Sequence, residues 1–172
     1  MTAAANVDAG WTDLVTLLGE ELGTVRDLIA VGTEKRDALV AIDLPRVEAT
    51  NRREEELVRA LGEASLRRAG KIKVIARLHR VTDPEPRLEA IVAFAGEPRA
   101  SQVAVLRADL RRGLEELRRL NGLNQALTRQ SLTHAQEFLR LLARGGGSAS
   151  TYTRRGVDDR PVRASLVIDR TA

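Results

Sequence analysis

The chain has 172 residues, no cysteine and 2% aromatic residues, and its 28 basic and 24 acidic side chains leave a net charge of +4. This length suits one domain with a modest aliphatic core. The absence of cysteine excludes disulfides, thiolate metal sites and a thiol nucleophile. Leucine, alanine and arginine dominate, which favours helix over strand. We therefore predict an all-α protein.

The first helix is expected to begin near Trp11, with Thr12 as its N-cap, and to run to about Ile42. Residues 1–10 are small and polar and lack an apolar h-region, so we expect them to be disordered rather than a signal peptide. Nowhere does an apolar run approach the roughly 20 residues that cross a bilayer. These features predict a cytoplasmic protein without membrane insertion. The apolar seam of this helix has helical spacing: Leu14, Leu18, Leu22, Val25, Ile29, Gly32, Leu39 and Ile42.

Asp43-Leu44-Pro45 restarts the helix, because Asp43 can cap it and proline is tolerated in a first turn. The second helix is expected to stop near Gly70. Two short helices, 71–80 and 87–95, then flank the proline-containing segment 82–86. A long helix follows from about Pro98 to Ala143. The fold class predicted is an elongated antiparallel hairpin packed on a long third helix, a three-helix coiled-coil-like bundle over residues 11–144 with a short helical insert.

Residues 145–172 begin with Gly-Gly-Gly-Ser-Ala-Ser, a composition typical of a flexible linker. The segment contains the chain's one tyrosine, Tyr152. We expect this tail to be mobile in the free protein and to order on binding, since it has little apolar area to offset the entropy of fixing it.

The charge is unevenly distributed. Residues 1–70 carry 9 basic and 13 acidic side chains, whereas residues 99–144 carry 9 basic and 4 acidic ones. These two segments would attract each other if they packed antiparallel, so we expect much of the basic charge of the long helix to have an internal partner.

The long helix shows two apolar stripes. One seam runs through Val103, Leu106, Leu110, Leu114 and Leu117, and the same spacing then reaches polar residues at Asn121, Asn124, Thr128 and Ser131. Leu120, Leu123 and Leu127 form a second stripe beside it. A seam asparagine can fix helix register, or it can line a groove for a helix of another protein; both interpretations stay open. The second stripe predicts a surface that requires a partner.

Catalytic chemistry is not indicated. His79 and His134 have no partner at metal or triad spacing, and Glu54-Glu55-Glu56 is interpreted as a solvated face with pairs at helical spacing. The glycine run lacks the lysine and the helix start of a phosphate loop. We expect no enzyme activity, no metal and no cofactor.

Over roughly residues 12–157 the chain combines a long helical hairpin, a short insert, a long third helix ending in Leu-Asn-x-x-Asn-x-x-Leu then Ser-Leu, a linker, and Thr-Tyr-x-x-x-Gly. This pattern resembles the FlgN family of flagellar export chaperones, and its carboxy-terminal motif is the distinctive part. The residues that carry the resemblance are Leu120, Asn121, Asn124, Leu127, Ser131, Leu132 and Phe138 on the long helix, with Thr151, Tyr152 and Gly156 in the tail. It implies a cytoplasmic chaperone of flagellum assembly, which holds hook-associated (hook-filament junction) proteins before type III secretion. It also implies delivery to the cytoplasmic domain of the export gate.

On this resemblance, the client-binding residues are expected to be Leu120, Asn121, Leu123, Asn124, Leu127, Ser131, Leu132 and Phe138, and the gate-docking residues Tyr152 and Gly156. We expect a monomer or a weak homo-oligomer that binds no nucleic acid. Two alternatives stay open, a basic helical nucleic-acid-binding protein and a structural coiled-coil protein.

Overall fold

The computed structural model describes residues 3–145. They form four helices, α1 (Ala3–Val40), α2 (Leu44–Leu78), α3 (Leu88–Val92) and α4 (Arg99–Gly145), and no strand lies within this range. The predicted all-α class is therefore confirmed. The chain divides into a first unit, Met1–Thr133, and a second unit, His134–Ala172. The predicted flexible tail lies outside the described residues, except for its first residue, which ends α4.

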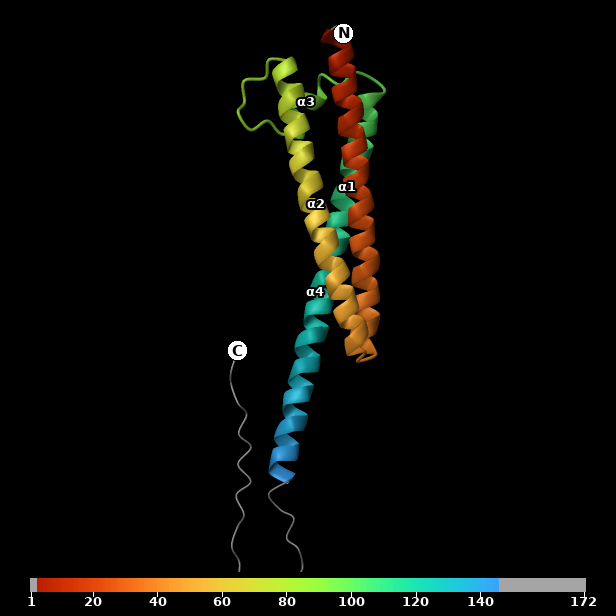
Figure 1. Ribbon diagram of the computed structural model, residues 1–172, viewed down its shortest axis with the longest axis vertical. Helices are drawn as coiled ribbons and strands as arrows, with labels where there is room; N and C mark the ends of the chain where they lie inside the picture. Colours follow the sequence, from red (N-terminus) through yellow and green to blue (C-terminus); the bar gives the residue numbers. More distant parts are fainter. Residues whose placement is uncertain (1–2, 146–172) are drawn as a thin grey trace, which may run out of the picture. The chain divides into compact units, whose positions relative to one another are not determined.

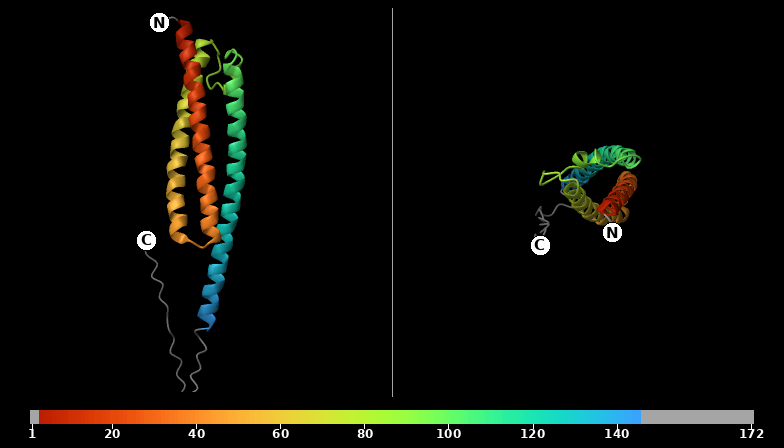
Figure 2. Two further views of the ribbon diagram at one scale, coloured as in Figure 1. Left: turned by 90° about the vertical axis from the view of Figure 1, so that its right-hand side faces the viewer. Right: turned by 90° about the horizontal axis from the view of Figure 1, so that it is seen from above.

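The helices α1 and α2 form the predicted antiparallel hairpin (Figure 1). Asp43 caps α2 as expected: its Oδ1 accepts a hydrogen bond from the backbone N–H of Arg46 at 3.2 Å, and Pro45 lies in the first turn. In the first unit α4 also packs on α1, and it runs in the same direction as α1 and opposite to α2 (Figures 1 and 2). The predicted hairpin with a third helix is thus confirmed, with α4 parallel to α1.

A single core of aliphatic side chains and Trp11 joins the elements of the first unit. Leu14 and Leu18 of α1, Ile75 of α2 and Val103 of α4 are fully buried, and α3 adds Ile91. Burial of such side chains contributes on the order of 1.5–3 kcal/mol each. The buried cluster comprises Trp11, Leu14, Leu18, Leu22, Val25, Ile72, Ile75, Ala76, Leu88, Ile91, Ala95, Val103 and Leu110.

The start of α1 differs from the sequence prediction. The helix begins at Ala3, so the expectation of disorder over residues 1–10 is wrong from Ala3 onward, and Thr12 is not an N-cap. Its hydroxyl donates instead to the carbonyl of Asp8 within the helix, at 3.0 Å. Val7 and Gly10 explain the longer helix, because Val7 packs on the core and Gly10 is buried.

The end of α2 also differs. Gly70 does not stop the helix, and the segment predicted as a separate short helix at 71–80 is the last part of α2. Ile72 and Ile75 are buried there, so their packing outweighs the roughly 1 kcal/mol that an internal glycine costs. The second predicted short helix exists as α3, within residues 87–95.

Two glycines let α1 and α4 approach closely. A Cβ atom added at Gly32 of α1 would lie 2.8 Å from Cδ2 of Leu120 of α4, and one added at Gly113 of α4 would lie 2.8 Å from Cγ1 of Val25 of α1. Each helix therefore offers a notch to an apolar side chain of the other. The two contacts fix both the separation of the helices and the rotation of α4 about its own axis.

Ion pairs join α1 to α2 much more than to α4. The expectation that the long helix finds its partners in the acidic amino-terminal half is therefore largely wrong. Among the described residues, Arg99 with Asp8 at 2.7 Å is the one ion pair between α1 and α4, and Arg107 pairs with Glu89 of α3. The reason is that the hairpin satisfies its own carboxylates, in the pairs Lys35–Glu54, Arg46–Glu34, Arg53–Glu34, Arg67–Glu20, Arg68–Glu21 and Lys71–Asp13.

Glu21 is the buried member of this set, with its side chain only 5% exposed. Its Oε1 lies 3.1 Å from Nε of Arg68, although the two groups are not aligned as a hydrogen bond. Burial raises the pKa of Glu21 above its ordinary value of 4.5, and the attraction of Arg68 opposes this shift. Ionised Glu21 is therefore a cost to the fold that its partner only partly offsets.

Gly113→Ala tests the notch between α1 and α4. The added methyl group meets Val25, whose β-branched side chain is stiff, so we expect the free energy of unfolding to fall by about 1–2 kcal/mol. Gly122→Ala is the matched control in the same helix, because a Cβ there meets nothing within 4 Å. It should raise stability by up to about 1 kcal/mol through helix propensity. Urea unfolding measures the free energy of unfolding of both variants. If both were stabilised equally, Val25 would not pack against Gly113 as described.

Glu21→Gln tests the raised pKa through the pH dependence of stability. A raised pKa means that the folded chain holds the proton more tightly, so the contribution of Glu21 is largest below its unfolded pKa and is lost as the pH rises through the folded one. We expect the stability of the native sequence relative to Glu21→Gln to increase from about pH 7 to about pH 4.5 in urea titrations. A decrease would show that attraction to Arg68 dominates burial.

Candidate binding surface on the long helix

The face of α4 that packs on α1 in the first unit repeats every seven residues. Half-buried or buried positions follow this repeat: Val103, Leu106, Leu110, Gly113, Leu117, Leu120, Asn124 and Leu127. The predicted seam is therefore right at Leu117 and Asn124 but wrong at Leu114, Asn121, Thr128 and Ser131, all of which are exposed. The error arises at Gly113. A glycine does not count as apolar in a search for hydrophobic spacing, yet this one is a seam position because Val25 packs against it.

Asn124 is buried on this seam, with 4% of its surface exposed. Its Nδ2 donates to the carbonyl oxygen of Gly32 at 2.8 Å, which connects α4 to the backbone of α1. Its Oδ1 is buried without a hydrogen-bond partner. Asn124 is thus used inside the fold, in the geometry expected of a residue that sets helix register.

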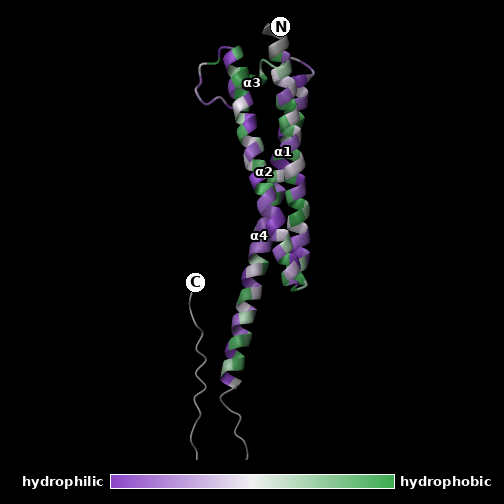
Figure 3. Cartoon of the chain, in the orientation of Figure 1, coloured by the Kyte–Doolittle hydropathy of each residue, from purple (hydrophilic) through white to green (hydrophobic). Residues whose placement is uncertain are grey.

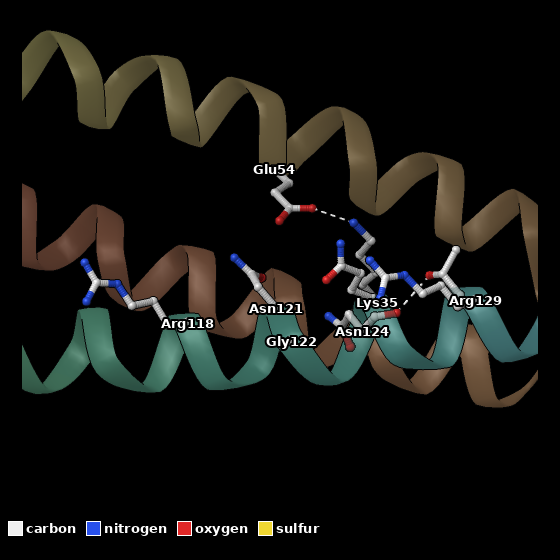
Figure 4. A pocket seen from close by; sticks show the side chains of 9 residues that line it. Lys35, Glu54, Arg118, Asn121, Gly122, Asn124 and Arg129 are labelled. Carbon is white, nitrogen blue, oxygen red and sulfur yellow. Dashed lines mark hydrogen bonds and ion pairs between the residues drawn. The ribbon is translucent and has the colours of Figure 1, made fainter.

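Asn121 instead lines an open hollow of about 580 Å³, to which α1, α2 and α4 all contribute side chains. Figure 4 shows Glu54 of α2 and Lys35 of α1 in this hollow, joined by an ion pair of 2.7 Å, and Arg118, Asn121 and Arg129 entering from α4. The lining offers donors from guanidinium and amide groups, and its carboxylate is already paired.

Apolar side chains remain exposed along α4. In the first unit Leu123 is 43% and Leu132 is 59% exposed. In the second unit, within residues 134–144, four large side chains are exposed by more than half: Phe138, Leu139, Leu141 and Leu142. Hydrophobic residues recur over the last turns of α4 in Figure 3. Four large apolar side chains within residues 138–142 exceed the singly scattered hydrophobic residues of an ordinary surface, so this segment is a candidate interaction site.

The structure separates the residues that the sequence grouped as client-binding. Leu120 and Asn124 are buried against α1 and Leu127 is half-buried, whereas Asn121, Leu123, Ser131, Leu132 and Phe138 are exposed. The prediction of Leu120 as a surface residue is wrong, because it occupies the notch at Gly32. Tyr152 and Gly156 lie outside the described residues.

Sequence reasoning missed Leu139, Leu141 and Leu142 as candidate binding residues. The sequence did contain a signal for them: four of the five residues in 138–142 are large and apolar, whereas one helical stripe would account for only two such residues. Within residues 3–145 no group of acidic or histidine side chains is arranged to hold a metal ion. No helix in that range is both long and apolar enough to span a membrane.

A family model described as FlgN protein matches residues 10–159. The chain belongs to the FlgN family. No curated protein and no solved structure matches it. Membership of the FlgN family indicates a chaperone role in flagellum assembly. That role agrees with a helical bundle that leaves apolar side chains uncovered on one helix, because a chaperone needs such a surface for an unassembled partner.

Leu120 and Leu123 provide a test of the seam. Leu120→Ala should lower the free energy of unfolding by about 2–4 kcal/mol, because it empties a buried position that cannot fully collapse. Leu123→Ala, three residues away on the exposed side, should cost less than about 1 kcal/mol. Chemical denaturation of the two variants measures both values. Equal losses would mean that α4 is rotated relative to the packing described above.

Proposed function

We propose that this FlgN-family protein holds unassembled hook-associated proteins of the flagellum and delivers them to the cytoplasmic domain of the export gate. The observation that carries the proposal is the set of exposed apolar side chains on α4, together with family membership. A hook-associated protein before assembly exposes helical segments with an apolar face. Such a face is protected from self-association when it binds a complementary apolar surface.

The proposed client surface has two parts, one in each unit. Leu123 and Leu132, with the polar Asn121 and Ser131, belong to the first unit, and Phe138, Leu139 and Leu142 belong to the second. All are exposed, so binding needs no rearrangement of the core. Large aliphatic and aromatic groups supply contact area without demanding one particular partner sequence, and this suits a chaperone that must later release its client.

Tyr152 and Gly156 are proposed to dock on the export gate. Tyrosine combines a large apolar ring with a polar tip and loses little entropy on binding, so it is a common anchor in transient interfaces. Because the sequence preceding it is rich in glycine and serine, this anchor can reach a partner while α4 holds the client.

Two variants with opposite expected defects test whether α4 binds the client and Tyr152 docks on the gate. Phe138→Ala/Leu142→Ala should weaken binding to purified hook-associated proteins by about tenfold or more, because truncation of two anchors at an interface costs at least about 1 kcal/mol each. The same variant should keep its affinity for the isolated cytoplasmic domain of the gate. Tyr152→Ala should behave the other way, losing gate affinity and keeping client affinity. Calorimetric titration measures the affinity of each of the two variants for the client and for the gate domain.

Gln136→Ala is the matched control, since it truncates an exposed polar side chain in the same turns of α4. It should change neither affinity by more than about twofold. All variants should retain their helix content and melting temperature, because the described positions are exposed. Undiminished client binding by Phe138→Ala/Leu142→Ala would contradict the proposed client surface, and unchanged gate binding by Tyr152→Ala would contradict the docking role.

A further inference from the structure

A groove runs beside α4 in the first unit, between α4 and the hairpin. The hollow at Lys35 and Glu54 forms one end of it. A second hollow, of about 320 Å³, is lined by Leu18 of α1, Arg68 of α2 and a stretch of α4 that includes Leu114. Arg118 lines both hollows, so they adjoin along α4.

Four arginines of α4 line this groove, and one of them, Arg107, is paired with Glu89 of α3. Arg111, Arg118 and Arg129 line its hollows, and they are spaced by seven and eleven residues, two and three helical turns, so they share one stripe. None of the three forms an ion pair with another described residue, whereas Arg68 across the groove is paired with Glu21. The carboxylates within reach are few: Glu54 is paired with Lys35, and Glu115 lines the second hollow.

The floor of the second hollow is apolar. Leu18 and Leu110 are buried beneath it, and Leu114, 39% exposed, lies between Arg111 and Arg118 in the sequence of α4. An apolar side chain flanked by unpaired guanidinium groups is complementary to an apolar side chain flanked by carboxylates. Bidentate pairing between guanidinium and carboxylate would add both strength and register.

We propose that this groove is a second binding site, which takes an amphipathic acidic helix of a partner protein. The site is elongated along α4, and two arginines spaced by seven residues match two acidic residues at the same spacing on a helix laid beside it. Such a helix places an apolar residue against Leu114 and carboxylates against Arg111 and Arg118. The partner would thereby supply a further long helix, packed against α1, α2 and α4.

Charge and polarity distinguish this occupant from others. Residues 146–172 of the chain itself carry 5 basic and 3 acidic side chains, so they do not complement an arginine-lined groove. A nucleic acid would neutralise the arginines but would place phosphates against the leucine floor, which offers them no hydrogen bond. The groove shares only Asn121 with the proposed client surface, so binding at either site can be lost separately.

The experiment uses the full chain and a labelled synthetic helical peptide of about 20 residues as the probe. The peptide carries leucine flanked by glutamates at helical spacing, and a scrambled peptide of the same composition is its control. Fluorescence anisotropy at low salt should show at least about tenfold tighter binding of the ordered peptide. Arg111→Gln/Arg118→Gln should abolish this preference and weaken binding about tenfold or more.

Arg112→Gln/Arg119→Gln is the matched control, because it removes two charges at the same spacing from the adjacent face of α4. It should weaken binding by less than about threefold. Equal losses in the two double variants, equal binding of the scrambled peptide, or no binding of the ordered peptide would each overturn the proposal. So would displacement of the ordered peptide by polyuridylate at lower concentration than by unlabelled peptide. Because all four arginines are exposed, circular dichroism should be unchanged throughout.

Discussion

The close approach of α4 to α1 determines which side chains this protein presents to others. Leu120 enters the notch at Gly32, and Val25 lies against Gly113. Two contacts seven residues apart on parallel helices leave α4 no freedom to rotate. As a consequence Leu123 faces outward and Leu114 lies at the edge of the groove. A rotation of one residue, about 100°, would take Leu120 out of the notch and change which side chains of α4 are exposed in the first unit.

The distribution of ion pairs differs between the hairpin and α4 in the first unit. The hairpin of α1 and α2 pairs most of its charges internally, whereas α4 is held mainly by apolar contacts and keeps several arginines unpaired among the described residues. Exposed ion pairs contribute little to stability, so their uneven distribution matters less for folding than for recognition. Unpaired arginines attract acidic partners over about a Debye length. Basic net charge therefore resides on the helix that also displays the apolar side chains.

The sequence predicted most of the fold but only part of the surface. The hairpin, the cap at Asp43 and the long helix follow from local signals, namely apolar spacing and turn chemistry, which act within a few residues. The continuation of α2 through Gly70 depends on tertiary burial of Ile72 and Ile75, which no local propensity contains. The phase of the α4 seam required knowing that Gly113 faces Val25. An error at that one position moved Leu120 from the core to the predicted client surface.

Asn124 shows why the fold retains a polar residue where leucine would bury more apolar area. Its Oδ1 lacks a partner, which costs stability, and its single hydrogen bond goes to the carbonyl of Gly32. That bond is available only when Asn124 is opposite Gly32, so it selects one register of α4 on α1. The same register seats Leu120 beside it in the notch. A protein proposed to bind partners through leucines on one face and arginines on another has more need of a unique register than of the last increment of stability.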